Sequence, residues 1–156
     1  MNEPLIFDIA LGRTKPVNMR DASVRCPFCD RSNLTDILAQ DGHIIWLMNK
    51  YPVLKDTWPT VIIETEGDQG ELSTLSLDEA TRIIQFGMDK WHETISTKEF
   101  ESVLFFKNHG PMSGGSIRHP HSQIIGLRTY DYHEDITVEN MNGWLLHENQ
   151  DIRITL

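Results

Sequence analysis

Three nitrogen-bearing side chains alternate along the segment His119-Pro120-His121-Ser122-Gln123. In an extended chain, side chains two positions apart point to the same face, so we expect His119, His121 and Gln123 to share one face while Ser122 points the other way. Pro120 limits the backbone freedom before His121 and helps to fix the direction of its ring. A neutral imidazole held in this way is suited to attack phosphorus as a nucleophile.

A glycine turn lies directly upstream, in the sequence Gly114-Gly115-Ser116. Because glycine has no side chain, such a turn lets backbone N–H groups approach a bound anion closely. We expect these N–H groups, together with Ser116 and Gln123, to hold phosphoryl oxygens while His121 attacks. The two neighbouring motifs therefore predict a catalytic site for phosphate chemistry.

The only two cysteines of the chain form the motif Cys26-Pro27-Phe28-Cys29. Two cysteines at this spacing favour metal binding or redox chemistry in a reducing compartment over a structural disulfide. A glutaredoxin-like redox site needs a strand directly before the motif and a helix that begins at it. Residues 21–25 are a poor strand and residues 30–33 a poor start for a helix, so we favour a zinc site.

The pattern Asn-x-Gly-x-x-x-Gly-Gly-Ser-x-x-His-Pro-His-x-Gln, from Asn108 to Gln123, resembles the active-site signature of the galactose-1-phosphate uridylyltransferase branch of the histidine-triad superfamily. Histidine-triad hydrolases carry a third histidine where this chain has Gln123. The resemblance implies an α+β fold, with a HIT-like antiparallel sheet and one main helix packed on it. It covers only the first of the two similar halves that members of this branch carry.

The resemblance also implies an activity and a set of ligands. His121 would form a covalent nucleotidyl-histidine intermediate from a nucleoside-diphosphate sugar, and a sugar phosphate or inorganic phosphate would then accept the nucleotidyl group. Asn108 would orient the glycine loop or contact the phosphate, and Asn49 would hydrogen-bond the ribose. Arg13 would reach the phosphates, unless the basic segment around it is a solubilising arm.

The same resemblance implies a Zn²⁺ ion bound by Cys26, Cys29 and His119. Asp68 occupies the position where relatives often have a fourth, histidine ligand. A carboxylate is a less common partner for two thiolates on zinc. The site is therefore weak, completed by Asp68 or by water, or empty, and Asp68 is otherwise a solvated acid on an acidic loop.

Hydrophobic patterning predicts the elements that position these residues. Asp41-Gly42 is a favoured two-residue hairpin turn, and Ser76 with Glu79 forms a capping box for a helix that runs to about Ser96. The apolar stripe expected to face the core of this helix consists of Ala80, Ile83, Ile84, Gly87, Met88, Trp91 and Ile95. The predicted strands are 36–40, 43–48, 61–65, 103–108, 122–128, 144–148 and 152–156.

Length and charge limit the remaining alternatives. The chain has 156 residues, which predicts one domain, with an irregular basic arm over 1–25 and a zinc- and nucleotide-binding core over 26–156. Its net charge of −9 argues against nucleic acid as the partner. It shows no signal peptide and no membrane-spanning run, so we expect a cytoplasmic protein. The last predicted strand stops at Leu156, which indicates either a fragment or a homodimer in which a second copy covers the edge.

Two functions other than nucleotidyl transfer stay open. A hydrolase of the same superfamily would pass the nucleotidyl group to water, but Gln123 argues against it. A non-catalytic, zinc-containing nucleotide-binding module would also agree with the absence of the second half of the family and with the unusual Asp68.

Overall fold

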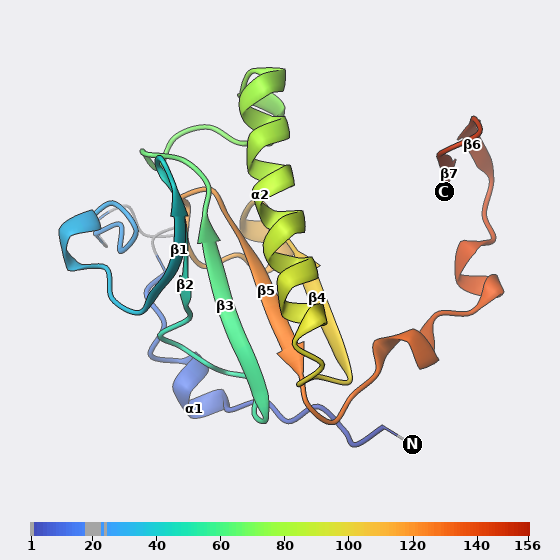
Figure 1. Cartoon of the computed structure of the whole chain (residues 1–156), viewed down its shortest axis with the longest axis horizontal. Helices are drawn as coiled ribbons and strands as arrows, with labels where there is room; N and C mark the ends of the chain where they lie inside the picture. The colour runs from blue at the N-terminus through green and yellow to red at the C-terminus, as the bar shows by residue number, and fades with distance from the viewer. Residues whose placement is uncertain (1, 18–22, 24) are drawn as a thin grey trace.

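The computed structural model describes residues 2–17, 23 and 25–156 of the chain. Its centre is a five-stranded antiparallel sheet with the strand order β1-β2-β3-β5-β4. The strands are β1 (Ile37–Asp41), β2 (Ile44–Met48), β3 (Thr57–Ile63), β4 (Ser102–Phe106) and β5 (His121–Leu127). One long helix, α2 (Leu77–Ser96), lies across one face of this sheet (Figure 1). The predicted α+β architecture is confirmed.

The β1–β2 hairpin differs from the prediction by one residue at its turn. Asp41 belongs to β1 and pairs with Ile44, so the two-residue loop is Gly42-His43 rather than Asp41-Gly42. Gly42 has φ 60°, which suits the first position of a type II′ turn. Asp41 instead accepts two hydrogen bonds, of 3.0 and 2.8 Å, from the guanidinium of Arg82 on α2.

Helix α2 begins after Ser76 as the sequence predicts, but only the Ser76 half of the expected capping box is present. The Ser76 side chain accepts a hydrogen bond of 3.2 Å from the backbone N–H of Glu79, whereas the Glu79 carboxylate pairs with His43 at 2.6 Å. The expected apolar stripe is wrong in part, because Ile84 and Ile95 are 49% and 42% exposed. The residues of the helix that are fully buried are Ile83, Gly87 and Thr94.

Gly87 explains how the helix packs on the sheet. A Cβ atom at this position would lie 2.4 Å from Cζ of Phe105 on β4. The absence of a side chain at Gly87 therefore lets the helix approach the sheet closely. Phe105 joins a core on this face that contains Ile44, Trp46, Ile62, Ile83, Val103 and Ile124.

The strand boundaries near the site depart from the prediction at β3. This strand starts at Thr57 and ends at Ile63, whereas the predicted range is 61–65. It includes Pro59, which has no N–H to give to a ladder and which makes a strand harder to recognise in the sequence. Glu64 leaves the ladder, and its N–H donates to the Pro120 carbonyl at 3.1 Å.

The two ends of the chain lie outside the sheet (Figure 1). The N-terminal segment, predicted to be irregular, contains the short helix α1 (Ile9–Gly12), capped by Asp8; residues 1, 18–22 and 24 of the predicted basic arm lie outside the described residues. At the other end, β6 (Leu145–Glu148) and β7 (Arg153–Thr155) form the predicted pair. The short 3₁₀ helices are η1 (Arg31–Asn33), η2 (Leu72–Thr74), η3 (Pro111–Ser113), η4 (Tyr132–Asp135) and η5 (Val138–Met141).

Candidate functional site

His121 is the first residue of β5, and a hydrogen bond sets which of its ring nitrogens carries the proton. Its Nδ1 lies 2.7 Å from the carbonyl oxygen of His119. A carbonyl only accepts, so Nδ1 is the protonated nitrogen and Nε2 keeps a free lone pair. Burial lowers the pKa of His121, which favours the neutral ring that a nucleophile requires.

Gln123 lies on the same face of β5 as His121, as predicted. In the sheet register His121 is opposite Ile63 and Gln123 is opposite Val61. Ser122, between them, is buried and points to the other face. The ladder begins only at His121, so strand alternation does not govern His119, and its place on this face stays a prediction.

The glycine loop precedes β5 and folds on itself. Gly110 and Gly114 have φ values of 74° and 82°, a region that favours glycine. The Asn108 side chain donates to the Ser113 carbonyl at 2.8 Å, so Asn108 orients this loop. Ser116 is half-buried near its end, and its contact with a phosphate stays a prediction.

Gly115, the other glycine predicted to approach a phosphate, is buried and packs against the backbone of the loop. A Cβ atom there would lie 3.3 Å from the Gly110 carbonyl oxygen. This close approach leaves little space for a side chain, which is a reason for glycine at this position that does not involve a ligand.

Cys26, Cys29 and His119 bring their ligand atoms within 4.8 Å of one another and could hold a metal ion. Nδ1 of His119 is 3.5 Å from each of the two sulfurs. Nε2 of the same ring lies 2.8 Å from the Thr65 carbonyl oxygen. Because Nε2 must donate to this carbonyl, the lone pair of Nδ1 points toward the sulfurs, as a metal ligand requires.

The two sulfurs form a disulfide bond in this structure, which the sequence did not favour. A bond between cysteines three residues apart closes a very short loop and stabilises a fold little through chain entropy. Reduction supplies two thiolates, and two thiolates with one imidazole are a donor set typical of zinc. The residues present therefore fit the metal that the resemblance implies.

Asp68, the predicted fourth ligand, is not part of this three-residue group. Its carboxylate accepts a hydrogen bond of 2.9 Å from the Gln69 side chain. Burial lowers the pKa of His119, and the negative charge of Asp68 opposes this shift. Asp68 is therefore close enough to act on His119 electrostatically, and its role as a ligand stays a prediction.

The structure places the two remaining predicted ligands as follows. Asn49 follows β2, and its side chain accepts a hydrogen bond of 2.9 Å from the N–H of Tyr51. Arg13 is exposed directly after α1. Lys15, for which the sequence predicted no separate role, is half-buried. The pKa of His121 is lowered mainly by burial of its ring, and the positive charge of Lys15 is a smaller cause in the same direction.

Sequence reasoning missed a partly buried ion pair next to the site. Glu64 follows β3 and Lys107 follows β4, the two strands that flank β5. Nζ of Lys107 lies 2.5 Å from the Glu64 carboxylate and 3.3 Å from the His121 carbonyl oxygen. The carbonyls of His119, Pro120 and His121 are thus held by the His121 ring, the Glu64 N–H and Lys107, respectively. The only signal in the sequence is a charged residue directly after each of two apolar runs.

Phe28, inside the cysteine motif, was also missed. Its ring contacts the rings of His119 and His121 edge-on, with centroid distances of 6.0 and 5.4 Å. It also packs against the apolar cluster of Ile45, Leu47, Val61 and Ile63. Phe28 therefore joins the cysteine motif to the face of the sheet that carries His121.

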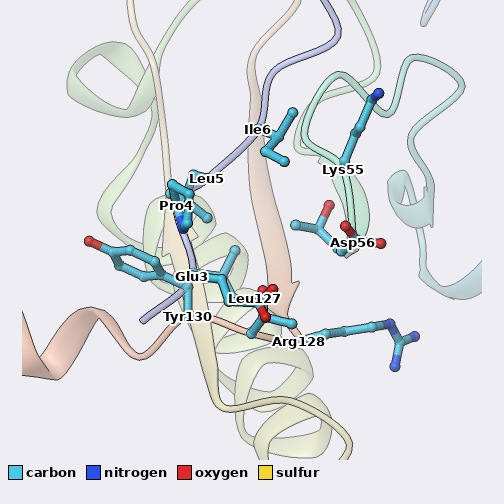
Figure 2. Close-up of a pocket in the computed structure, with 11 residues that line it drawn as sticks. Glu3, Pro4, Leu5, Ile6, Lys55, Asp56, Leu127, Arg128 and Tyr130 are labelled. Atoms are coloured by element: carbon cyan, nitrogen blue, oxygen red, sulfur yellow. The ribbon is translucent and has the colours of Figure 1, made fainter. Parts of the chain in front are cut away.

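A small cavity lies at the other end of β5. Figure 2 shows its lining, which includes the N-terminal segment from Glu3 to Ile6 together with Leu127 and Tyr130. Glu3 anchors this segment through a backbone hydrogen bond of 3.3 Å to Thr129. None of the predicted site residues lines the cavity.

Comparison with known structures supports the fold and the family. A DUF4931 family protein from Bacillus cereus is 41% identical, with a TM-score of 0.72 over 77% of this chain and 55% of that one. A uridylyltransferase structure is 21% identical, with a TM-score of 0.60 over 83% and 53% of the two chains. A HIT family protein from Bacillus anthracis is 18% identical, with a TM-score of 0.56 over 75% and 89%. The fold is therefore HIT-like, as predicted.

The galactose-1-phosphate uridylyltransferase of Streptomyces lividans is 24% identical in an alignment of 150 positions that covers 86% of this chain and 42% of that protein. The chain thus spans about half the length of this relative and of the Bacillus cereus protein. No helix in the described ranges is long and apolar enough to cross a bilayer. Residues 7–130 match the N-terminal domain of DUF4931, described as a domain of unknown function. The chain therefore belongs to the DUF4931 family, of which it carries this N-terminal domain.

Proposed function

We propose that this chain carries the catalytic half-site of a nucleotidyltransferase that acts on a nucleoside-diphosphate sugar. The observation that carries the proposal is the hydrogen bond of 2.7 Å from Nδ1 of His121 to the His119 carbonyl. It leaves Nε2 unprotonated on the face that also carries Gln123, next to the glycine loop. The distant relationship to a galactose-1-phosphate uridylyltransferase supports the choice of substrate class.

The reaction has two displacements at the α-phosphorus. In the first, Nε2 forms a bond to phosphorus while the P–O bond to the sugar phosphate breaks, and the sugar phosphate leaves. In the second, an oxygen of a sugar phosphate or of inorganic phosphate attacks, and the P–N bond breaks. The ring is positively charged in the intermediate because Nδ1 keeps its proton, and the His119 carbonyl stabilises this charge through the same hydrogen bond.

The other predicted residues have roles around this step. The side chains of Gln123 and Ser116, with the N–H groups of Gly114 and Gly115, would hold phosphoryl oxygens, while Asn108 orients the loop. Asn49 would bind the ribose. Arg13 would bind phosphate from the N-terminal segment.

Zinc bound by the reduced Cys26 and Cys29 and by His119 would supply a rigid structural cross-link and no redox chemistry. Because its ligand His119 lies two residues before His121, the ion would fix the backbone that presents the nucleophile. A homodimer and a cytoplasmic location stay predictions of the sequence.

Trapping the intermediate tests the proposal. The reduced protein is incubated with UDP-glucose or ADP-glucose labelled at the α-phosphate, and protein-bound label is measured after acid and after base. We expect label that is stable in base and labile in acid, as a phosphoramidate is, and its loss in His121→Ala. His92→Ala is the matched control, because His92 is exposed on α2.

The other outcomes identify the rival functions. Free labelled nucleotide without protein-bound label would replace the proposal with a hydrolase. Binding of nucleotide with neither product would replace it with a non-catalytic module.

A further inference from the structure

One carbonyl oxygen, that of Thr65, accepts hydrogen bonds from two side chains. Nε2 of His119 lies 2.8 Å from it, and Nη2 of Arg31 also donates to it. Thr65 is 7% exposed and His119 is fully buried, so both residues of this contact belong to the interior. The direction of the Thr65 carbonyl therefore controls the His119 ring.

Arg31 links three parts of the chain through its guanidinium. It lies two residues after Cys29, at the start of η1. Its Nη1 donates to the His43 carbonyl, in the β1–β2 hairpin, at 2.7 Å, while Nη2 donates to Thr65 beyond the end of β3. The planar, forked guanidinium spans both carbonyls at once, which a lysine ammonium at the end of a flexible stem does not do.

A role in surface electrostatics does not explain Arg31. Within the described ranges it forms no ion pair with a carboxylate, and its Nε is buried without a hydrogen-bond partner there. Arg82, in contrast, forms a two-bond ion pair with Asp41 at the surface. A buried donor without a partner destabilises a fold, so another contribution of Arg31 must offset the cost of its unpaired Nε.

That contribution is to keep His119 in one tautomer. With Nε2–H bonded to Thr65, Nδ1 presents its lone pair to both sulfurs, each at 3.5 Å. If the Thr65 carbonyl turned away, the proton would be free to move to Nδ1, and a protonated Nδ1 does not ligate a metal. Holding this carbonyl in place therefore keeps the ring ready to bind.

We propose that Arg31 is a positioning residue of the metal site: by fixing the Thr65 carbonyl, it holds His119 in the tautomer and direction in which Nδ1 joins the thiolates of Cys26 and Cys29. The inference rests on the metal-binding part of the proposed function and is independent of the transfer reaction.

Metal titration of the reduced protein tests this role. Co²⁺ is added to the wild type and to Arg31→Met, Arg31→Lys and Arg82→Met, and Zn²⁺ affinity is measured by competition with a chelator. We expect Arg31→Met to weaken Zn²⁺ binding about 10–100-fold, the usual effect of removing a group that orients a ligand. Arg31→Lys should lose affinity as well, because it has no fork, and Arg82→Met should bind like the wild type.

Two spectroscopic readouts separate positioning from a general loss of stability. The absorption spectrum of the Co²⁺-saturated protein reports ligand geometry, and NMR of ring-¹⁵N histidine in the metal-free protein reports the His119 tautomer. We expect both to change in the Arg31 variants and neither to change in Arg82→Met. If Arg31→Met does not fold, Arg31→Lys supplies the same comparison.

Two results would overturn the inference. The first is wild-type affinity, spectrum and tautomer in Arg31→Lys and in any folded Arg31→Met. The second is a reduced wild-type protein that binds neither Co²⁺ nor Zn²⁺, which would also remove zinc from the proposed function while the trapping experiment still decided transfer. A protein that binds metal in an Arg31-dependent way but traps no nucleotide would support the inference and refute the transfer reaction.

Discussion

The two ends of strand β5 show how one segment carries both chemistry and packing. At its start, His121 and Gln123 are half-buried, and the backbone around them is held by polar groups, including the partly buried Glu64–Lys107 pair. At its far end, Ile125 and Leu127 pack with Leu54 in an apolar cluster. Side chains alternate in the same way at both ends, so the difference comes from the side chains of β5 itself and from the groups that the neighbouring segments supply. We expect substitutions at the start of β5 to change activity or the pairing of buried charges, and those at its far end to change packing alone.

The largest expected effect is at the nucleophile. His121→Gln removes the nucleophilic nitrogen but keeps a polar side chain at the start of β5, so we expect transfer to fall about 10³-fold or more, as on removal of a covalent catalyst. Steady-state exchange between a nucleotide sugar and a labelled sugar phosphate measures this, and circular dichroism checks that the fold is kept. Activity near the wild-type level would exclude His121 as the nucleophile.

Removing the cation behind β5 tests how far polar groups hold this end. Lys107→Met leaves the Glu64 carboxylate, whose side chain is 2% exposed, without its partner. We expect the free energy of unfolding to fall by about 3 kcal/mol, measured by urea denaturation, because a buried charge without a partner is strongly unfavourable.

The double variant Glu64→Gln/Lys107→Met removes both charges and should recover most of that stability. A single variant within about 1 kcal/mol of the wild type would show that the pair contributes no more than an exposed one does.

At the apolar end, Gly126→Ala tests the packing. The new Cβ would lie 2.6 Å from Cδ1 of Phe100, a ring that is stacked on Trp58 and covered by Arg128. Since this ring has little freedom to move, we expect the free energy of unfolding to fall by about 1–3 kcal/mol. Gly67→Ala is the matched control, because a Cβ atom at Gly67 would meet no described residue beyond its chain neighbours within 4 Å. Equal stability of the two variants would contradict the packing account.

The smallest expected effect comes from shortening one side chain of the same end. Ile125 is 9% exposed, so Ile125→Val should lower the free energy of unfolding by about 0.5–1.5 kcal/mol through the loss of one methylene. Trapping of label by the folded protein should equal that of the wild type. A lower rate of trapping would show that the two ends of β5 are coupled, which the comparison does not predict.

Local pattern was sufficient for much of the fold. The helix that begins after Ser76, the pairing of the last two strands and the shared face of His121 and Gln123 all follow from short-range rules of capping and alternation. The cysteine spacing likewise indicated two thiol ligands, and each of these features depends on residues within a few positions of one another. The assignment of His119 to the same metal group, 90 residues beyond Cys29, came only from the family resemblance.

The errors arose where distant segments compete for the same residue. Ile84 and Ile95 fit a helical stripe, but the helix packs closely on the sheet at Gly87. The buried line of α2 therefore runs through Ile83 and Gly87, as expected, and through Thr94, which was not expected. Asp41 was expected in a turn and instead bonds Arg82, which comes from the helix. Local periodicity contains no information about which side of a helix meets a sheet most closely.

The sequence by itself determined the chemical groups of this protein: the imidazole of His121 that we propose as the nucleophile, a glycine loop, and two cysteines with a histidine. Only the tertiary structure decided how these groups are oriented. Glu64 and Lys107 are 43 residues apart and meet because β3 and β4 lie on either side of β5, and Arg31 reaches Thr65 because the cysteine motif packs beside the sheet. Hydrogen bonds between such distant residues depend on the strand order, which no short stretch of sequence specifies.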